Sequence, residues 1–354
     1  MLITKWTSKL LHSTGGALTS RLLRKHSKPN VAFRHYTLET APKAPTCSAL
    51  QDIRSVIKLK GEDCYPFLQG LITNDVYELE ESDNGVGCIY GMILNNKGRI
   101  AHDILLYKTD QNDDNSSVLL ECDRKSKSNI IKLLKMYKLR KKVQISPEDD
   151  VQVFQLLAPD VEDIEEVKSL IQPDYAATTS VFRDPRLADL GYRCLAVTAN
   201  PFSNNIDISS PVDYHRKRYD FGIPEGIDEI KSGKLLPLET NIDFMNGVSF
   251  NKGCYIGQEL TARTYHTGVI RKRLVPCALS SAECAEDDRL FVSIEGTAKP
   301  KRVGKIVSVL EDKALALMNI EFLSQDIFTK AGSKVDCSKP AWWPCSGDNP
   351  HSFS

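Results

Sequence analysis

The sequence predicts an α+β protein whose character changes near residue 271. Before this position, apolar runs of strand length alternate with helical segments, which predicts mixed modules of helices and strands. After it, short alternating runs are separated by turn residues, which predicts a small antiparallel barrel or sandwich. A content of 41% apolar and 26% charged residues is typical of a globular protein. No apolar run approaches the roughly 18 residues that a membrane-spanning helix needs.

Residues 1–40 predict a mitochondrial transit peptide. Residues 1–38 contain seven Lys or Arg and no acid, and five leucines can line one side of an amphipathic helix. A secretory signal would need a longer apolar block, and the remaining alternative is a disordered basic tail. The rest of the chain has 39 basic and 46 acidic residues, a net charge of −7. This balance excludes a uniformly basic nucleic-acid binder.

The first half of the mixed region predicts a hairpin and a short helix. Ser48–Leu59 is expected to be extended, and Gly61–Gly70 to form a turn and a helix. Val86–Leu94 and Arg99–Tyr107 flank the turn residues Asn95–Gly98, which is a strong hairpin signal.

A basic segment, Lys125–Lys142, follows the hairpin and predicts an amphipathic helix. Its apolar residues recur at helical spacing, at Ile130, Ile131, Leu133, Leu134 and Tyr137. The basic side chains are interpreted as a solvated face, and the alternative is a patch for an anionic partner.

The second half of the mixed region repeats this alternation of elements. Val151–Leu157 and Arg193–Thr198 predict strands, and Val161–Ile171 and Asp213–Gly222 predict helices, the second ended by Gly and Pro. The chain beyond 271 then predicts short strands at Leu290–Ile294, Val303–Leu310 and Ala314–Ile320.

Cysteine and histidine spacing argues against a zinc ribbon or a dithiol redox motif. None of the ten cysteines is in a CxxC pattern, and no HxxxH pattern occurs. In a reducing compartment most of these cysteines are expected to be free thiols that behave as small apolar residues.

The strongest candidate for chemistry is Cys254, in the segment VSFNKGCYIGQELTAR at residues 248–263. Glycines on both sides allow a tight turn that leaves the thiol near the surface. Neighbouring cations, and the dipole of a helix starting just afterwards, would favour the thiolate. Such a thiolate can ligate a soft metal or attack an electrophile. A buried structural cysteine is an equally good interpretation. The supporting motif residues are Lys252, Gly253, Gly257, Gln258, Glu259 and Arg263.

A second candidate is Asp103, in the segment NNKGRIAHD at residues 95–103. A carboxylate in this position can accept a hydrogen bond from a ring N–H or stabilise a developing cation. An ordinary cap or salt bridge is the alternative.

The segment around Cys254 closely resembles the signature of folate-binding, aminomethyltransferase-like proteins of the YgfZ type. Within them it is most similar to the mitochondrial iron–sulfur cluster assembly branch, also known as the CAF-seventeen-type transferases. Further motifs occur in the family's order, from residue 48 to about 330. They are FLQGLITNDV at 67–76, NNKGRIAHDILLY at 95–107, LGYR at 190–193, RYDFGIPEG at 218–226, LPLETNIDFMNGVSF at 236–250 and KRVGKIVSVL at 301–310.

The resemblance implies three pseudo-subdomains around a central hole, ending in an antiparallel β-barrel. It implies an aminomethyltransferase-like domain over residues 46–270, a barrel over 271–338 and a flexible tail over 339–354. It also implies a folate cavity that would involve Asn74, Asp103, Tyr192 and Arg193, with Asp103 beside the folate N5. Arg193 follows Gly191-Tyr192 where the transferases have an acid nearby, and His102 replaces the first of their paired acids. Since carboxylates hold the pterin ring, these departures predict weakened folate recognition.

The function that the resemblance implies is non-catalytic support of [4Fe–4S] cluster maturation in the mitochondrial matrix. The partners would be A-type scaffold proteins, a glutaredoxin and target apoproteins of the aconitase and lipoyl synthase type. Cys254 would be a redox thiol or a transient cluster ligand shared with a partner, because a cluster needs about four ligands. No tightly bound cofactor, membrane or nucleic-acid partner is expected. The alternatives are a tetrahydrofolate-dependent one-carbon transferase that uses Asp103, and a folate-linked tRNA-modification factor.

Overall fold

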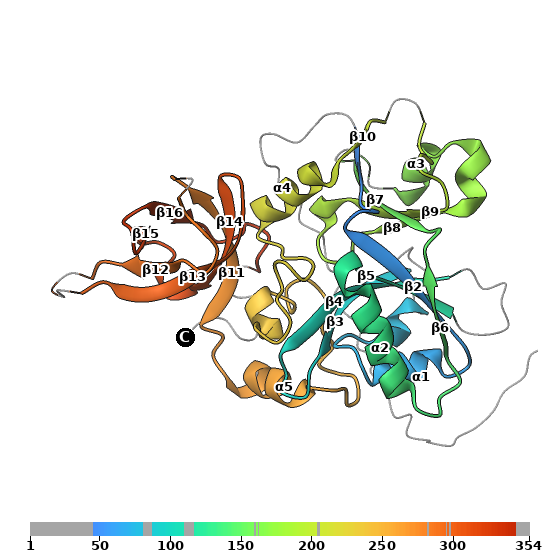
Figure 1. Ribbon diagram of the computed structural model, residues 1–354, viewed down its shortest axis with the longest axis horizontal. Helices are drawn as coiled ribbons and strands as arrows, with labels where there is room; N and C mark the ends of the chain where they lie inside the picture. Colours follow the sequence, from blue (N-terminus) through green and yellow to red (C-terminus); the bar gives the residue numbers. More distant parts are fainter. Residues whose placement is uncertain are drawn as a thin grey trace, which may run out of the picture. The chain divides into compact units, whose positions relative to one another are not determined.

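The computed structural model describes residues 45–344 apart from 81–86, 110–116, 159–160, 162, 204–205, 282, 295 and 297–298. The predicted transit peptide and residues 345–354 of the predicted tail lie outside the described residues. Within these ranges, every helix is too short or too polar to cross a bilayer. The strands form two open sheets and a closed barrel (Figure 1).

The first sheet is antiparallel and contains the predicted hairpin. Its strand order is β3-β4-β5-β2-β6. The hairpin prediction is confirmed, and Asp103 lies opposite Met92 in the β3–β4 pair. One core cluster joins this sheet to the helices α1 and α2, and Ile130 and Leu134 are the buried stripe of α2. The bounds are β2 (Arg54–Lys60), β3 (Cys88–Leu94), β4 (Ile100–Lys108), β5 (Ser117–Asp123), β6 (Gln144–Glu148), α1 (Cys64–Gln69) and α2 (Lys127–Lys138).

The second sheet has the order β10-β1-β7-β9-β8, with β1 and β10 parallel and the other pairs antiparallel. The extended piece expected over Ser48–Leu59 is therefore two strands. The chain turns at Leu50, whose carbonyl accepts from the Arg54 amide, and passes from one sheet into the other. The bounds are β1 (Thr46–Ala49), β7 (Gln152–Leu157), β8 (Thr179–Arg183), β9 (Tyr192–Ala196), β10 (Ile208–Ser209), α3 (Ile164–Ser169) and α4 (Pro211–Phe221).

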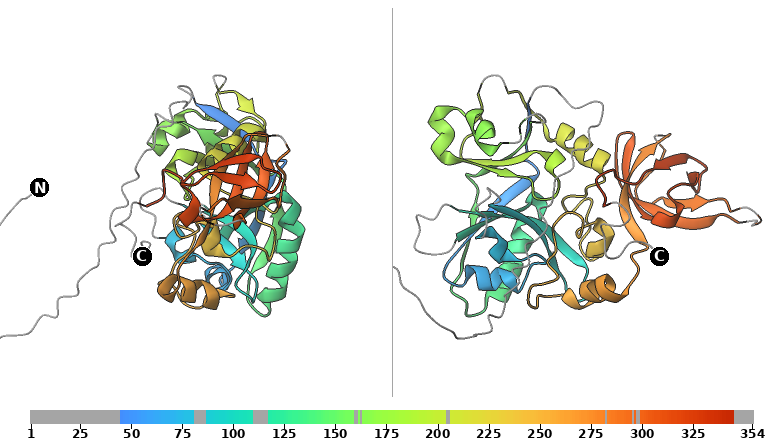
Figure 2. Two further views of the ribbon diagram at one scale, coloured as in Figure 1. Left: turned by 90° about the vertical axis from the view of Figure 1, so that its left-hand side faces the viewer. Right: turned by 180° about the vertical axis from the view of Figure 1, so that it is seen from behind.

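The C-terminal strands close into a barrel, in the order β11-β14-β13-β12-β15-β16. Pairing of β16 back onto β11 settles the choice between barrel and sandwich that the sequence left open. The barrel faces the viewer in the left-hand view of Figure 2. Its strands are β11 (Lys272–Leu279), β12 (Arg289–Val292), β13 (Lys301–Leu310), β14 (Lys313–Asn319), β15 (Ile327–Thr329) and β16 (Lys334–Cys337).

Residues 339–344, where the sequence predicted the start of a flexible tail, include packed side chains. Trp342 and Trp343 are buried, and the Trp342 indole donates to the Phe221 carbonyl at the end of α4, at 2.8 Å. Trp343 lies 5.7 Å from Phe244 between ring centroids. Two indoles bury enough apolar surface to hold an otherwise polar segment in place. The remaining helices are α5 (Gln258–Thr267) and the 3-10 turns η1 (Val76–Leu79), η2 (Arg124–Ser126), η3 (Pro173–Thr178), η4 (Ala188–Leu190), η5 (Pro237–Thr240) and η6 (Ile320–Phe322).

Candidate functional site: an exposed cysteine loop and a buried charge cluster

One cysteine is exposed among the nine that the structure describes. Cys254 is accessible, whereas the other eight are buried. Burial raises the pKa of the Cys122 and Cys194 thiols to about 12, so they are protonated at neutral pH. Because the thiolate is the nucleophile and the metal ligand, Cys254 is the described thiol best placed for chemistry with a partner.

Lys252 anchors the loop that carries Cys254. Its ammonium is turned inward and donates to the carbonyls of Ile72 at 2.9 Å and Asn74 at 2.6 Å. The side chain is 8% exposed, and its Nζ lies 5.1 Å from the centre of the Tyr255 ring. Burial lowers the pKa of Lys252 to about 8. The role expected from the sequence, a charge acting on the thiol, is therefore replaced by a structural one.

The two glycines beside Cys254 have different roles. Gly257 has a φ of +78°, and a Cβ there would collide with the Asn95 carbonyl and lie 2.9 Å from the Leu94 side chain. The position therefore requires glycine for two reasons. Its φ is positive, and its backbone lies close to the β3–β4 turn. Gly253 has an ordinary φ and open space around its α-carbon. Of the two predicted turn glycines, only Gly257 is demanded by the backbone.

Helix α5 begins after the cysteine rather than at it. Gly257 is the N-cap residue and Gln258 the first helical residue, so Cys254 precedes the cap by three positions. Arg263 pairs with Glu259 one turn earlier on the exposed face of α5. The Gln258 side chain accepts a hydrogen bond from the Tyr255 amide at 3.3 Å, which ties the loop to the helix.

Two sequence motifs that lie far apart in the chain meet beneath the cysteine loop. The Thr73 hydroxyl donates to the Gly247 carbonyl at 2.7 Å, and the Asn74 amide donates to the carbonyls of Tyr90 and Asn246, both at 2.8 Å. With the two Lys252 contacts, these bonds hold the loop against the turn before η1. The segments 67–76 and 246–252 therefore contact each other through buried hydrogen bonds.

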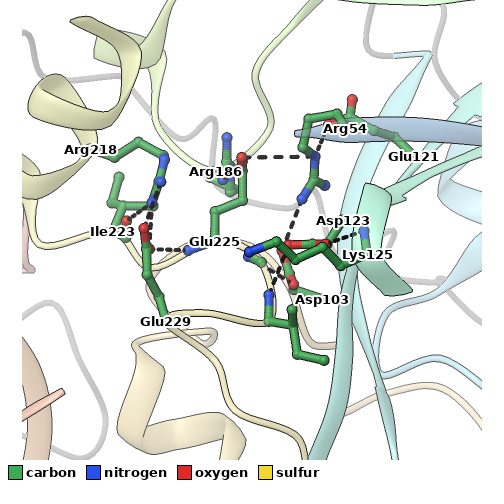
Figure 3. Close-up of polar contacts among 12 residues, drawn as sticks. Arg54, Asp103, Glu121, Asp123, Lys125, Arg186, Arg218, Ile223, Glu225 and Glu229 are labelled. Carbon is green, nitrogen blue, oxygen red and sulfur yellow. Dashed lines mark hydrogen bonds and ion pairs between the residues drawn. The ribbon is translucent and has the colours of Figure 1, made fainter. Parts of the chain in front are cut away.

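A buried charge cluster lies between the two sheets (Figure 3). Arg54 on β2 donates to Glu121 on β5 at 2.6 Å, and its guanidinium lies 3.8 Å from the Asp103 carboxylate on β4. Glu225 accepts from Arg186 and Arg193, both at 2.7 Å. Each of these six side chains is at most 5% exposed.

The cluster extends from Glu225 through the segment that follows α4. The Tyr214 hydroxyl donates to Glu225 at 2.5 Å, and Arg218 binds Glu229 through both terminal nitrogens, at 2.7 and 2.8 Å. Burial alone would raise the pKa of Glu225, but Arg54, Arg193 and Arg186 outweigh it and hold that pKa well below its usual range. The arginines and carboxylates of the cluster thus neutralise each other where the two open sheets meet the segment that follows α4.

Asp103 is one of several members of the cluster that are incompletely hydrogen-bonded. One oxygen accepts from the Gly226 amide at 3.1 Å, whereas Oδ2 has no hydrogen-bond partner among the described residues. Burial raises the pKa of Asp103, although Arg54 opposes the shift. The two terminal nitrogens of Arg54 also lack a hydrogen-bond partner in the described part of the chain. A small polar molecule or water could satisfy these atoms.

Known proteins share both the barrel and the whole arrangement. The model of the CAF17 C-terminal β-barrel domain matches residues 271–345. The mitochondrial iron–sulfur cluster assembly factor IBA57 of Mus musculus is 38% identical over 310 residues, which cover 84% of this chain and 86% of its own. The Homo sapiens protein of that name is 36% identical, with 86% and 87% covered. The chain belongs to the IBA57 family.

The IBA57 relatives are named as mitochondrial proteins, and this family member is mitochondrial. Among solved structures, the aminomethyltransferase T of the glycine cleavage system from Bartonella henselae is similar, with a TM-score of 0.63 and 11% identity. The match covers 84% of this chain and 86% of that one. It confirms the aminomethyltransferase-like fold with its C-terminal barrel. A central hole stays a prediction.

The predicted folate cavity is only partly assembled in this IBA57-family chain. Asp103 and Arg193 both belong to the charge cluster. Tyr192, the neighbour of Arg193 on β9, faces the opposite side of the sheet, where its hydroxyl donates to the Val161 carbonyl at 2.9 Å. The Asn74 amide hydrogens already have backbone partners. These four residues therefore do not all line one cavity, and folate binding stays a prediction.

Several residues of this IBA57-family site were not predicted from the sequence. Arg54, Arg186 and Glu225 are central to the charge cluster. Isolated Arg and Glu residues form no recognisable sequence pattern, and only the folded sheets bring them together. A groove of about 370 Å³ along α5 was also missed, because Leu260 and Thr264 of the helix face residues from two other segments. These segments are residues 236–239 and 269–272.

Proposed function

We propose that this chain supports the maturation of mitochondrial iron–sulfur clusters, with Cys254 as a transient cluster ligand or redox thiol. The observation that carries this proposal is the exposure of one thiol on a loop that buried contacts hold in place. The names of the IBA57 relatives supply the class of function. The cluster is cargo in this proposal, and its assembly is completed on other proteins.

The single thiol makes a partner part of the proposal. Iron–sulfur clusters are held by about four thiolate or imidazole ligands. Among the described residues, no three His, Cys, Asp or Glu side chains are grouped to hold a metal ion. We therefore propose that Cys254 adds one ligand to a cluster whose other ligands come from an A-type scaffold protein, with a glutaredoxin supplying clusters upstream. Targets would be [4Fe–4S] enzymes of the aconitase and lipoyl synthase type.

Anchoring of the loop supports a role in ligand exchange. The Lys252 contacts and the Gly257 turn hold the backbone on both sides of Cys254, while the thiol itself stays in solvent. A ligand held in place loses less conformational entropy when it binds. Exposure lets the cluster leave again, as transfer to a target requires.

The experiment is anaerobic cluster reconstitution of an equimolar mixture of the mature protein and an A-type scaffold, followed by absorption spectroscopy. The wild type is expected to give a cluster spectrum that differs from that of the scaffold alone. Cys254→Ser should abolish the difference. Gly253→Ala is the matched control, because it alters the adjacent residue in open space and keeps the thiol. Identical spectra for wild type and Cys254→Ser would overturn the proposal.

A tetrahydrofolate-dependent transferase is a second candidate because of one observation: Oδ2 of buried Asp103 has no hydrogen-bond partner among the described residues. Tetrahydrofolate would then raise the Tm of the wild type, and Asp103→Asn would remove most of that rise. The cluster spectrum with the scaffold should be insensitive to Asp103→Asn under the assembly proposal. The two variants therefore separate the two functions.

A further inference from the structure

Two buried cysteines face each other across the seam that closes the barrel. Cys277 on β11 and Cys337 on β16 are directly opposite in the antiparallel pair, although 60 positions separate them in the sequence. Their sulfur atoms lie 2.7 Å apart, and each residue is 5% exposed. Opposite residues of antiparallel strands have Cα atoms about 4.5–5.5 Å apart, which lies within the range that a disulfide spans.

We infer that Cys277 and Cys337 form an oxidation-responsive dithiol that closes as a disulfide when peroxide reaches the barrel. In the reducing environment of the mitochondrion the pair rests as two thiols. Peroxide is the oxidant that suits this seam, because its size lets it enter during small openings of the strands. Bulky disulfides such as glutathione disulfide would need a larger opening.

The proposed reaction balances with peroxide alone. One thiolate attacks hydrogen peroxide, which gives a sulfenic acid and hydroxide. The second thiol then attacks the sulfenic sulfur, the S–S bond forms, and water leaves. Together two thiols and one peroxide give one disulfide and two waters. Burial raises the pKa of Cys277, so the first step should be slow at neutral pH and faster in alkaline buffer.

The disulfide would fasten the first strand of the barrel to its last. The strand β16 leads directly into the segment that holds Trp342 against the end of α4. The crosslink would therefore secure both the closure of the barrel and the start of this C-terminal segment. Since it closes a long loop of the unfolded chain, oxidation should raise the Tm by roughly 5 °C.

The test uses the mature protein carrying Cys254→Ser, which prevents crosslinks between molecules through the one thiol that is exposed among the described cysteines. The protein is treated with hydrogen peroxide, alkylated in denaturant and analysed by peptide mass spectrometry. A linked Cys277–Cys337 peptide is expected, which dithiothreitol should resolve into two free thiols. Cys284 is the internal control, because it is buried to a similar degree in the same region but lies outside the barrel strands.

Two further measurements make the result specific. In Cys277→Ser, peroxide should leave Cys337 without a disulfide partner and should not raise the Tm. In the parent protein, the rise in Tm should disappear with dithiothreitol. Full alkylation of Cys277 and Cys337 after peroxide treatment would overturn the inference. A disulfide between Cys284 and either of them, at a yield similar to that of the Cys277–Cys337 disulfide, would also overturn it. If Cys277→Ser does not fold, the Cys254→Ser protein alone still shows whether peroxide links Cys277 to Cys337.

Discussion

The cysteine loop and the charge cluster use polar groups in opposite ways. In the loop, one thiol is left in solvent while buried contacts on both sides hold the backbone. In the cluster, Arg54 donates to Glu121 and Arg193 donates to Glu225, and all four side chains are buried. The first arrangement keeps a reactive group available to a partner. The second joins two sheets, although several buried atoms, including Asp103 Oδ2 and the terminal nitrogens of Arg54, have no hydrogen-bond partner among the described residues.

The largest expected effect comes from breaking the cluster at its centre. Glu225→Gln removes the charge that Arg186 and Arg193 share, and leaves buried guanidinium groups without their anion. The free energy of unfolding should fall by about 3–5 kcal/mol in chemical denaturation at pH 7. Glu259→Gln, on the exposed face of α5, is the control and should change stability by less than about 0.5 kcal/mol. Similar losses in both variants would contradict the contrast between the two regions.

The second effect concerns the backbone of the cysteine loop. Gly257→Ala forces a Cβ into the Asn95 carbonyl at a φ of +78°, and should lower the free energy of unfolding by about 2 kcal/mol. Gly253→Ala meets open space at an ordinary φ and should be neutral or slightly stabilising. Thermal and urea unfolding of the pair measure this difference directly. Equal sensitivity at both positions would mean that the turn is not held as described.

The third effect is a pH dependence due to Lys252. The pKa of Lys252 is about 8 in the folded protein, below its ordinary value of 10.5. Between these values the unfolded chain holds a proton that the folded protein has lost, so the stability from this group rises with pH. Below pH 8 both states are protonated and the contribution is constant.

Comparison with Lys252→Met isolates this contribution. The free energy of unfolding of the wild type relative to the variant should increase by about 1 kcal/mol between pH 8 and 10. This is less than the whole pKa difference would give, because part of the lysine remains near solvent. Urea unfolding at several pH values measures it. A relative stability that is flat or falls with pH would show that burial does not dominate at Lys252.

The smallest effect is expected from the ion pair on α5. Arg263 and Glu259 are both exposed and lie one turn apart, a geometry worth about 0.3–0.5 kcal/mol. Arg263→Gln should therefore leave stability almost unchanged and should not alter the cluster spectrum formed with the scaffold. A marked loss of the spectrum would indicate that Arg263 contacts the partner or the thiol.

Local patterns predicted much of the fold because they report local physics. The β3–β4 hairpin follows from turn residues between two apolar runs, and α2 follows from its apolar spacing. The division of Ser48–Leu59 into β1 and β2 was not predictable in this way, because both pieces are extended and only their partners differ. The packing of Trp342 was also missed, because its partner at the end of α4 is far away in the sequence.

The sequence by itself determined many of the elements, the family signature and the choice of Cys254 as the residue of interest, since these depend on residue type and on spacing along the chain. Only the tertiary structure decided that Cys254 is exposed, that Lys252 points inward and that Arg193 pairs with Glu225. It also placed Cys277 against Cys337. Burial, charge pairing and thiol contact all depend on neighbours from distant parts of the chain, and only folding brings these together.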